Sequence, residues 1–537
     1  MAEMLNRALA LHREGRLGEA RALYEALLQA DARHFDALKL LGTVALQQGD
    51  HQEAVRLITR ALEVNAGDAS AFNNRAVAFR ELGQLDAALA DCDRAIALEP
   101  RHADAHINRG VALKLMGRPH EAVASYQCAI GLAPGNADAH NNCSVVLCEL
   151  GEPQAALAHA DAALQGRPQF AEAWFNRGHA LQLLGELEAA RFCYEQAARL
   201  KPAYAQAFVN LGVVAHDLGR VAEAEAALRH AIALQPRNAD ALWNLSLVLL
   251  LQGHLAEGWP LYEWRRAPAA TGARPWRGGV PLAGKTILLH AEQGFGDVIQ
   301  FSRYVPLVAA LGARVVLGVP AALEGVLRSL GGVAGFYTGG PPPAGLDFEC
   351  PLMSLPLVFG TTLQSIPAAP RYLHAPPDRL AHWAGRLGPR VRPRIGIAWS
   401  GRSTHRGDRL RSLPLATLLD ALPPQFDYVS LQNEVREADR AALARVAHFG
   451  AEIADFGDTA ALCELVDRVV SVDTSVAHLA AALGRSTWVM LPFVPDWRWL
   501  TEREDSPWYP SMRLWRQDAT REWGPVLRRL AAALQAA

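Results

Sequence analysis

The chain has 537 residues, half of them apolar, and its 53 lysines and arginines nearly balance its 55 aspartates and glutamates. It is too long for one hydrophobic core, and a prior of roughly 100–200 residues per domain predicts about three folded units. The formal net charge of −2 gives no basic field for nucleic acid, which we therefore do not expect as a partner. The first residues lack the pattern of a signal peptide, and no long apolar run follows, so we expect a cytoplasmic protein without a transmembrane segment.

Glycines recur every 34 residues in the first half of the chain. They are Gly15, Gly49, Gly83, Gly117, Gly151, Gly185, Gly219 and Gly253. An alanine stands five residues after each of the first seven, from Ala20 to Ala224, where a small residue lets two helices approach closely. Prolines such as Pro100 close five of the units, as expected where one helix ends before the next begins. The pattern covers residues 1–270 and resembles the tetratricopeptide repeat, which implies an all-α superhelix of about eight helix–turn–helix units.

Asparagine occupies one place in the first helix of seven of these units. The column consists of Asn6, Asn74, Asn108, Asn142, Asn176, Asn210 and Asn244, with Leu40 as the exception. Because asparagine is a poor helix former, the column needs a reason other than helix stability. A carboxamide donates and accepts at once, so the six from Asn74 to Asn244 are predicted to hold the backbone of a polypeptide. The alternative is that they link neighbouring helices. The column resembles the asparagine ladder of O-linked N-acetylglucosamine transferases.

Cysteine and histidine spacing indicates no metal site. The seven cysteines form no C-x-x-C pair and lie mostly among apolar neighbours, which is typical of reduced, buried thiols. His102 and His106 stand four residues apart without a partner cluster. We therefore expect neither a metal nor a cofactor.

The pattern changes after residues 271–284, which we interpret as a linker. Short β-rich runs alternate with helical segments over 285–375 (TILLHAE, ARVVLGV, GVAGFYT, LDFECP) and again over 390–537 (RPRIGIAWSG, FDYVSLQ, RVVSVD, STWVMLP, and a C-terminal helix). This alternation predicts two doubly wound, Rossmann-like α/β halves. Two such halves around a cleft make the GT-B arrangement of glycosyltransferases, in which ligands bind beyond the carboxyl ends of the strands.

Two polar stretches follow predicted strands. In HAEQGFGDVIQFSRYVP, Gly294 and Gly296 allow a tight loop, and Asp297 opens the next helix. In AWSGRSTHRGDRLRSLP, residues 398–414, four cationic or ionisable side chains crowd one loop. They are His405, Arg406, Arg409 and Arg411. The ordinary alternatives are a carboxylate favoured by a helix dipole and a solvated charged loop.

A third stretch, SVDTSVAHLAAALG at residues 471–484, is a predicted strand that turns directly into a helix behind Thr474 and Ser475. Such a turn leaves backbone N–H groups unpaired at the positive end of the helix dipole, where they attract phosphate or carboxylate. The alternative is a hydroxyl N-cap without a ligand.

Taken in this order, the motifs resemble the heptosyltransferase-like (glycosyltransferase family 9-like) enzymes over about residues 284–530. The specific pieces are GFGDVIQFSRYVP, WSG…H-R…R-S-L-P, VDTSVAHLAAALG and PDWRW…REDSPWYP. The resemblance implies that the turn holds the diphosphate of a nucleotide sugar on the amides of Ser475, Val476 and Ala477, and that Asp297 is the catalytic carboxylate. Further donor contacts are expected from Thr474, Arg406, Arg409 and Arg411 toward the phosphates, and from Gly296, Gln432, Asp458, Asp473 and His478 toward the sugar or nucleotide.

These motifs together predict an inverting, metal-independent glycosyltransferase that uses a nucleotide sugar as co-substrate and a polypeptide hydroxyl as acceptor. The pairing of repeats with such a domain is similar to that of O-linked N-acetylglucosamine transferases and of repeat-bearing flagellin glycosyltransferases. Two alternatives stay open, namely a glycan or lipid-linked acceptor and a non-catalytic peptide-binding scaffold. If Asp297 is not the base, Glu292 is the substitute.

Overall fold

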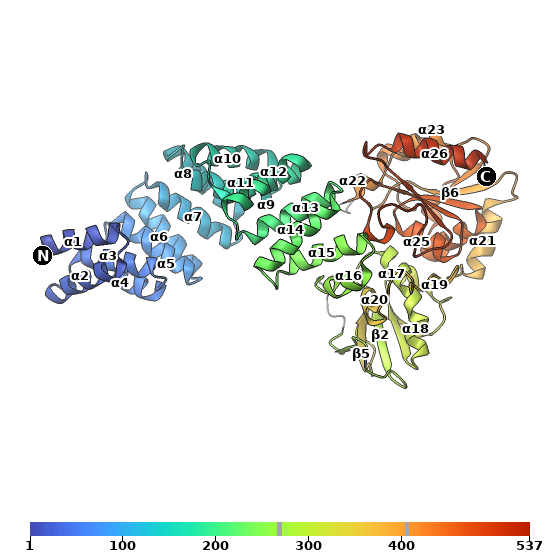
Figure 1. The fold of residues 1–537 in the computed structure, drawn as a ribbon, viewed down its shortest axis with the longest axis horizontal. Helices are drawn as coiled ribbons and strands as arrows, with labels where there is room; N and C mark the ends of the chain where they lie inside the picture. Colours follow the sequence, from blue (N-terminus) through green and yellow to red (C-terminus); the bar gives the residue numbers. More distant parts are fainter. Residues whose placement is uncertain (266–270, 403–406, 537) are drawn as a thin grey trace. The chain divides into compact units, whose positions relative to one another are not determined.

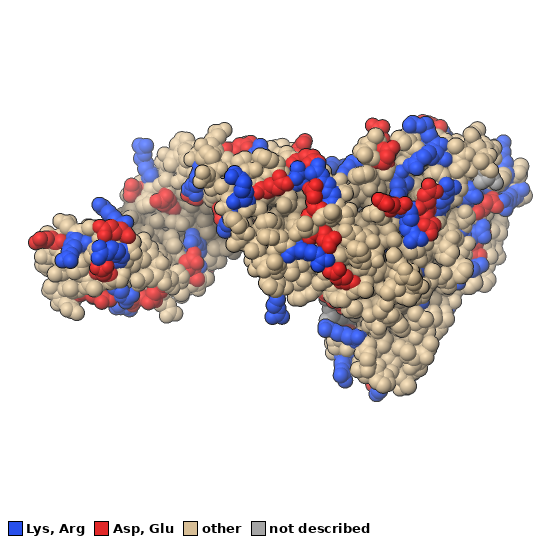
Figure 2. Space-filling view, in the orientation of Figure 1, with Lys and Arg blue, Asp and Glu red and all other residues tan. Residues whose placement is uncertain are grey.

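The computed structural model of the chain describes residues 1–265, 271–402 and 407–536. The chain forms two compact units, Met1–Val214 and Ala215–Ala537. On the face drawn in Figure 2, cationic and anionic side chains are interspersed, in keeping with the nearly balanced composition. Within the described ranges, no helix is both long and apolar enough to cross a membrane.

Helices α1–α16 form eight helix–turn–helix pairs (Figure 1). Their bounds are α1 Ala2–Arg13, α2 Leu17–Ala30, α3 Phe35–Gln47, α4 His51–Val64, α5 Ala69–Glu81, α6 Leu85–Leu98, α7 Ala103–Leu115, α8 Pro119–Leu132, α9 Ala137–Glu149, α10 Pro153–Gly166, α11 Ala171–Leu184, α12 Leu187–Leu200, α13 Ala205–Asp217, α14 Val221–Leu234, α15 Ala239–Leu251 and α16 Leu255–Tyr262. The boundary between the two units falls inside α13.

The 34-residue spacing is explained by the backbone at each turn. All eight recurring glycines adopt φ between +72° and +84°, the left-handed conformation that ends the first helix of a pair without a Cβ clash. The alanine five residues later is buried in each of the first seven pairs, where the two helices meet. At Gly110 the helices are so close that an added Cβ would lie 2.5 Å from the ring of Tyr126. The predicted helical repeats are therefore confirmed.

Two five-stranded, fully parallel sheets follow the repeats (Figure 1). The strands are β1 Arg274–Pro275, β2 Thr286–His290, β3 Arg314–Gly318, β4 Val333–Tyr337, β5 Phe348–Pro351, β6 Arg394–Ala398, β7 Asp427–Ser430, β8 Arg468–Val472, β9 Thr487–Leu491 and β10 Met512–Arg516. The helices between and after them are α17 Phe295–Phe301, α18 Val305–Ala310, α19 Ala321–Leu327, α20 Leu355–Val358, α21 Pro377–Leu387, α22 Asp408–Arg411, α23 Leu415–Ala421, α24 Phe456–Leu465, α25 Ser475–Ala482 and α26 Trp523–Ala536. The α/β prediction is confirmed.

The linker interpretation needs one correction. Strand β1 lies inside residues 271–284 and pairs with β5, so this stretch contributes an edge strand to the first sheet. A two-residue strand carries no alternation of apolar and polar residues, which is why the sequence pattern did not reveal it.

The second sheet is a middle layer between helices. Ile395 and Ile397 of β6 pack in one apolar cluster with α23 and α26, whereas Val469 and Val489 of the neighbouring strands pack in another with α24 and α25. Figure 1 shows α23 and α26 on one side of this sheet and α25 on the other. A parallel sheet covered on both faces leaves its strand ends as the place for a site.

Strand order places a switch point in each sheet. The first sheet has the order β1-β5-β2-β3-β4 and the second β10-β9-β8-β6-β7. The order in which the chain adds strands therefore reverses between β2 and β5 in the first sheet and between β6 and β8 in the second. Ligands of open parallel sheets bind beyond the carboxyl ends of strands at such points. The loops after β2, β6 and β8 contain the three polar stretches singled out in the sequence.

The last repeat is built into the same unit as the sheets. Trp259 of α16 packs edge-on against Trp497 and Trp508, with ring centroids 5.4 and 6.5 Å away, and its indole N–H donates to the carbonyl oxygen of Thr361 at 2.9 Å. This aromatic cluster ties α16 to the loop that follows β9.

Candidate functional site

The turn between β8 and α25 presents free backbone donors. Thr474 is extended, with φ −143° and ψ 171°, and its side chain does not cap the helix. Its carbonyl oxygen accepts from the N–H groups of Ala477 and His478 at 3.1 and 3.4 Å. The N–H groups of Ser475 and Val476 have no hydrogen-bond partner in the part of the chain that the structure describes. Two of the three backbone N–H groups expected to bind phosphate are thus available, because the N–H of Ala477 already donates to the carbonyl oxygen of Thr474.

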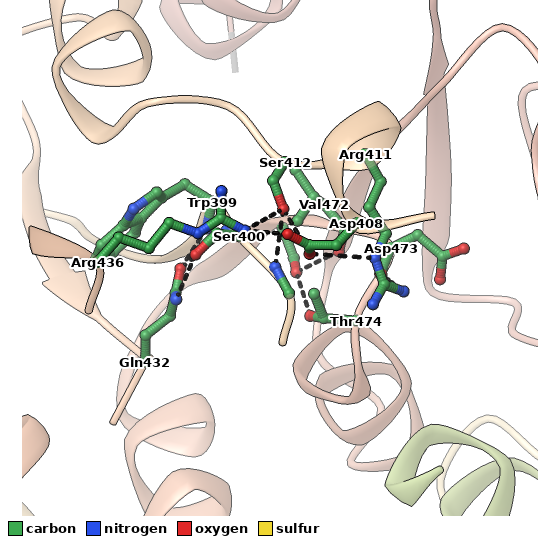
Figure 3. Close-up of polar contacts among 12 residues, drawn as sticks. Trp399, Ser400, Asp408, Arg411, Ser412, Gln432, Arg436, Val472, Asp473 and Thr474 are labelled. Atoms are coloured by element: carbon green, nitrogen blue, oxygen red, sulfur yellow. Dashed lines mark hydrogen bonds and ion pairs between the residues drawn. The ribbon is translucent and has the colours of Figure 1, made fainter. Parts of the chain in front are cut away.

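Arg411 joins the loop after β6 to this turn. Its Nη1 donates to the carbonyl oxygen of Asp473 at 2.8 Å, and its Nε lies 3.7 Å from a carboxylate oxygen of Asp408. Figure 3 shows its guanidinium beside Thr474. Gly401 makes room for this arrangement, since an added Cβ there would lie 2.6 Å from Nη2 of Arg411. A fixed positive charge therefore stands next to the open amides.

Arg409, another predicted phosphate-binding residue of this loop, is not brought to the turn in the same way. Arg409 is exposed, and no contact ties it to the turn among the described residues. His405 and Arg406 lie outside the described residues.

Gln432 braces the loop after β6, which corrects its expected role in nucleotide recognition. Its Oε1 accepts from the backbone N–H groups of Trp399 and Ser400 at 2.7 and 3.0 Å, and its Nε2 donates to the Ser400 hydroxyl at 2.9 Å (Figure 3). The side chain is 9% exposed. Both ends of the carboxamide are used inside the protein, so it holds the loop in shape instead of facing a ligand.

Asp297 lies at the start of α17, and its partners include a backbone N–H and an arginine. Its carboxylate accepts from the N–H of Gly294 at 2.9 Å and forms an ion pair with Arg498. Arg498 in turn pairs with Asp496 at 2.7 Å, and its Nε donates to the side-chain oxygen of Gln300 at 2.6 Å. Burial alone lowers the pKa of Arg498, but the charges of Asp496 and Asp297 outweigh it and raise that pKa above the ordinary value. The guanidinium is therefore a permanent cation that orients Asp297.

The helix of Asp297 meets the turn at Gly296. A Cβ added to Gly296 would lie 2.9 Å from the ring of His478 and 3.6 Å from the Cα of Ser475. His478 stacks on Trp499, with centroids 5.2 Å apart, and its Nδ1 lies 3.0 Å from the Tyr509 hydroxyl. Burial, reinforced by Arg498, lowers the pKa of His478 well below its ordinary value, so the ring is neutral. Gly296 and His478 pack against each other and bring α17 next to α25, and their expected contacts with the donor stay predictions.

Asp473 is the half-buried carboxyl of the turn. Burial and the negative charge of Asp496 raise its pKa to about 6, although Trp499, Arg411 and Arg498 oppose the rise. In Figure 3 its carboxylate points away from the polar network around Ser400. It stands directly before Thr474, and its expected contact with the sugar or nucleotide stays a prediction. A carboxyl with a pKa near neutrality, next to open amides and a guanidinium, is typical of functional sites.

Two carboxylates considered in the sequence are structural. Asp458, in α24, is 1% exposed and accepts from the Trp383 indole at 2.9 Å and from Arg379 at 3.1 Å, so it does not read a nucleotide. Glu292 has a side chain that is 2% exposed and pairs with Arg265 at 2.9 Å, so it is not a substitute base. In both carboxylates, side chains from other parts of the fold already bond to the oxygens.

The asparagine column serves partly as a link between repeats. Asn108 donates to Asn73 at 2.8 Å, and Asn176 donates to Asn141 at 2.7 Å, in each case 35 residues back along the chain. Other members also donate to protein oxygens: Asn74 to Thr43, Asn210 to Tyr194 and Asn244 to the carbonyl of Asp240. For Asn6 and Asn142 the described residues provide no side-chain hydrogen-bond partner. The alternative left open by the sequence, a link between helices, therefore holds at Asn74, Asn108, Asn176 and Asn210.

Metal-binding residues do not cluster in threes. Within the described ranges, no group of three or more His, Cys, Asp or Glu side chains could hold a metal ion. The seven cysteines are free thiols, and Cys128 alone among them is exposed. His102 instead caps α7, where its side chain accepts from the N–H of Ala105.

Comparisons with known proteins identify the repeats. Tetratricopeptide-repeat family models match residues 39–100, 73–137, 217–269 and 171–204. Protein FlbA of Caulobacter vibrioides (strain ATCC 19089 / CIP 103742 / CB 15) is 28% identical over 325 residues, which is 53% of this chain and 53% of that protein. The chain thus spans about half the length of this curated relative.

Solved structures of repeat proteins also match part of this chain. YrrB, described as a tetratricopeptide-repeat protein with an unusual peptide-binding site, is 29% identical over 34% of this chain and 95% of its own, with a TM-score of 0.30. A tetratricopeptide-repeat protein from Parabacteroides merdae ATCC 43184 is 18% identical over 46% of this chain and 98% of its own, with a TM-score of 0.38. The matches to the family models show that the chain contains tetratricopeptide repeats, and an α/β region with two parallel sheets follows them.

Proposed function

We propose that the chain is an inverting GT-B glycosyltransferase that moves a sugar from a nucleotide sugar to a hydroxyl of a polypeptide. The observation that carries this proposal is the β8–α25 turn. It offers two unpaired amides and Arg411 at a switch point of the second sheet, and the helix of Asp297 packs directly against it. Donor site and base candidate thus come from the two sheets of one unit.

The turn suits a leaving diphosphate. Backbone N–H groups at a helix N-terminus bind phosphate, and an adjacent guanidinium forms strong, charge-assisted hydrogen bonds to its oxygens. As the glycosidic bond to the nucleotide breaks, negative charge builds up on the departing phosphate. The amides of Ser475 and Val476 and the side chain of Arg411 are already in place to stabilise that charge. These groups supply the positive charge that a divalent ion would otherwise supply.

Asp297 suits the role of general base. A sugar or side-chain hydroxyl is a poor nucleophile until a base takes its proton. The carboxylate of Asp297 accepts from the N–H of Gly294 and pairs with the guanidinium of Arg498. These contacts orient the carboxylate. The hydroxyl oxygen attacks the anomeric carbon, its proton goes to Asp297, and the nucleotide leaves from the opposite face, which inverts the configuration.

The repeats suit the delivery of a polypeptide. Tetratricopeptide repeats commonly hold extended peptides in their groove, and Asn142 keeps a carboxamide that no described residue engages. A glycan acceptor remains the alternative, because hydrogen bonds within the repeats already use Asn108 and Asn176. A non-catalytic peptide-binding scaffold is favoured by one observation, the ion pair that Asp297 forms with Arg498.

The proposal is tested by incubating the full chain with a panel of nucleoside diphosphate sugars and measuring nucleotide release. We expect release from at least one donor in the parent and a loss of release in Asp297→Asn. Addition of a polypeptide acceptor should increase release and add the mass of one sugar to the acceptor. Binding of a donor without release in the parent would favour the scaffold, and absence of binding would remove the transferase proposal.

A further inference from the structure

Two histidines of the fifth helix pair lie ring to ring, outside the site described above. His140 belongs to α9 and His159 to α10, and their Nδ1 atoms are 3.0 Å apart. The rings are tilted by 41°, with centroids 5.2 Å apart. His140 is 8% exposed and His159 is half-buried.

The tautomer of His140 is fixed by its other nitrogen. Its Nε2 lies 3.0 Å from the carbonyl oxygen of Pro134, which can only accept, so Nε2 carries the proton. Its Nδ1 therefore presents a lone pair toward His159. A ring N–H held by a backbone carbonyl is the usual support of a metal-binding histidine, because it fixes both the tautomer and the ring orientation.

We propose that His140 and His159 form a two-imidazole binding site for a divalent transition-metal ion such as Zn²⁺. Two nitrogens that each lie about 2.0–2.1 Å from Zn²⁺ are about 2.9–3.4 Å apart for angles between a right angle and the tetrahedral one. The observed 3.0 Å falls within this range. Imidazole nitrogen suits zinc, copper and nickel ions. Water would complete the coordination, since the described residues supply no third ligand.

Without metal, the two rings share one N–H···N hydrogen bond.

The preceding repeat provides a natural control. His106 stands 34 residues before His140, and its Nε2 lies 3.2 Å from the carbonyl oxygen of Pro100. The residue 34 positions before His159 is Ser125, whose hydroxyl accepts from Arg109 at 2.7 Å. This preceding repeat therefore has serine at the position of His159, and its histidine contacts the proline carbonyl without a second imidazole.

The test is zinc binding by the full chain, titrated with ZnCl₂ against a chromophoric chelator after removal of bound metal. Because the chain has 18 histidines and 7 cysteines, the result is read as a difference between variants. We expect His159→Ser and His140→Gln each to lose one zinc equivalent of the parent, with affinity at that site falling by more than the roughly 10–100-fold that loss of an outer-shell partner costs. The control His106→Gln should bind as the parent does.

Zinc uptake that is the same in the parent and in either folded variant would overturn the proposal and leave the pair as a hydrogen bond only. Folding is checked by circular dichroism and melting without zinc, where His159→Ser should match the parent. A second readout does not depend on the variants. Zinc must raise the melting temperature of the helical repeats in the parent, and a parent that melts identically with zinc and with chelator contradicts the site.

Discussion

Asp473 should destabilise the folded chain at neutral pH. Burial and Asp496 raise its pKa from 3.8 to about 6, so the folded state holds the proton more tightly than the unfolded state does. The cost is therefore fully present above pH 6 and disappears as the pH falls below about 4. At about 1.36 kcal/mol per pKa unit, it amounts to about 3 kcal/mol at pH 7.5 and about 1 kcal/mol at pH 4.5. Asp473→Asn keeps the shape and removes the charge, so it should raise stability by these amounts.

The assay is urea unfolding followed by tryptophan fluorescence at the two pH values. Twelve of the thirteen tryptophans lie after residue 214, so the signal reports the unit that contains Asp473. Taking the difference between variant and parent at each pH cancels the titration of other groups. The matched control is Glu437→Gln, whose side chain is 81% exposed and pairs with Arg440 on the surface. Its effect should stay within about 1 kcal/mol and should not change with pH.

Two results would refute the reasoning about Asp473. A variant that is less stable than the parent at pH 7.5 would mean that Arg411 and Arg498 stabilise the carboxylate more than burial and Asp496 destabilise it. A gain that is equal at both pH values would mean that it comes from packing and not from ionisation. A destabilising carboxyl that persists in a fold is expected where it serves function.

Three further outcomes are expected. Asp297→Asn should lower nucleotide release by about 10²–10⁴-fold and leave the donor dissociation constant, measured by calorimetry, nearly unchanged. Full turnover in this variant would show that Asp297 is not the base. Chelator should leave nucleotide release unaltered, because Arg411 and the turn amides supply the positive charge; strict dependence on an added divalent ion would contradict that assignment. Asn108→Ala and Asn176→Ala should each lower the stability of the repeats by about 0.5–1.5 kcal/mol, whereas Asn142→Ala should leave melting unchanged, and equal melting of all three would show that the bonds to Asn73 and Asn141 contribute nothing.

Local patterns predicted the repeats and the strand-end loops correctly because both depend on neighbours in the chain. The glycine spacing follows from one backbone requirement, a left-handed residue at each turn. The turn at Thr474 follows from an apolar strand that meets a helix start. Parallel pairing of β6 with β8 then placed two of the predicted loops at one switch point.

The contacts of several candidate site residues depend on partners that are distant in the sequence, and sequence patterns do not identify such partners. Arg498 was missed although it lies in the quoted PDWRW motif, because its partner Asp297 is 201 residues away. Gln432 and Asp458 have the polarity of ligand-binding residues, but only the packed structure shows that internal donors use their oxygens. In the asparagine column, the periodicity gave the position of Asn108 but not the residue its side chain meets.

Calorimetry of nucleoside diphosphates with the full chain and with Ser475→Pro tests the donor site most directly. Thr474 is extended, as a residue before proline prefers, and Ser475 is the first residue of α25, where proline is tolerated, so the variant should fold and melt as the parent does. It lacks one unpaired N–H. Among uridine, guanosine, adenosine and thymidine diphosphates, at least one should bind the parent and bind the variant about tenfold or more weakly, since a hydrogen bond to a charged group contributes about 1.5–3 kcal/mol. Equal affinity in both proteins, or no binding of any of the four to the parent, would contradict a nucleotide-sugar site at this turn.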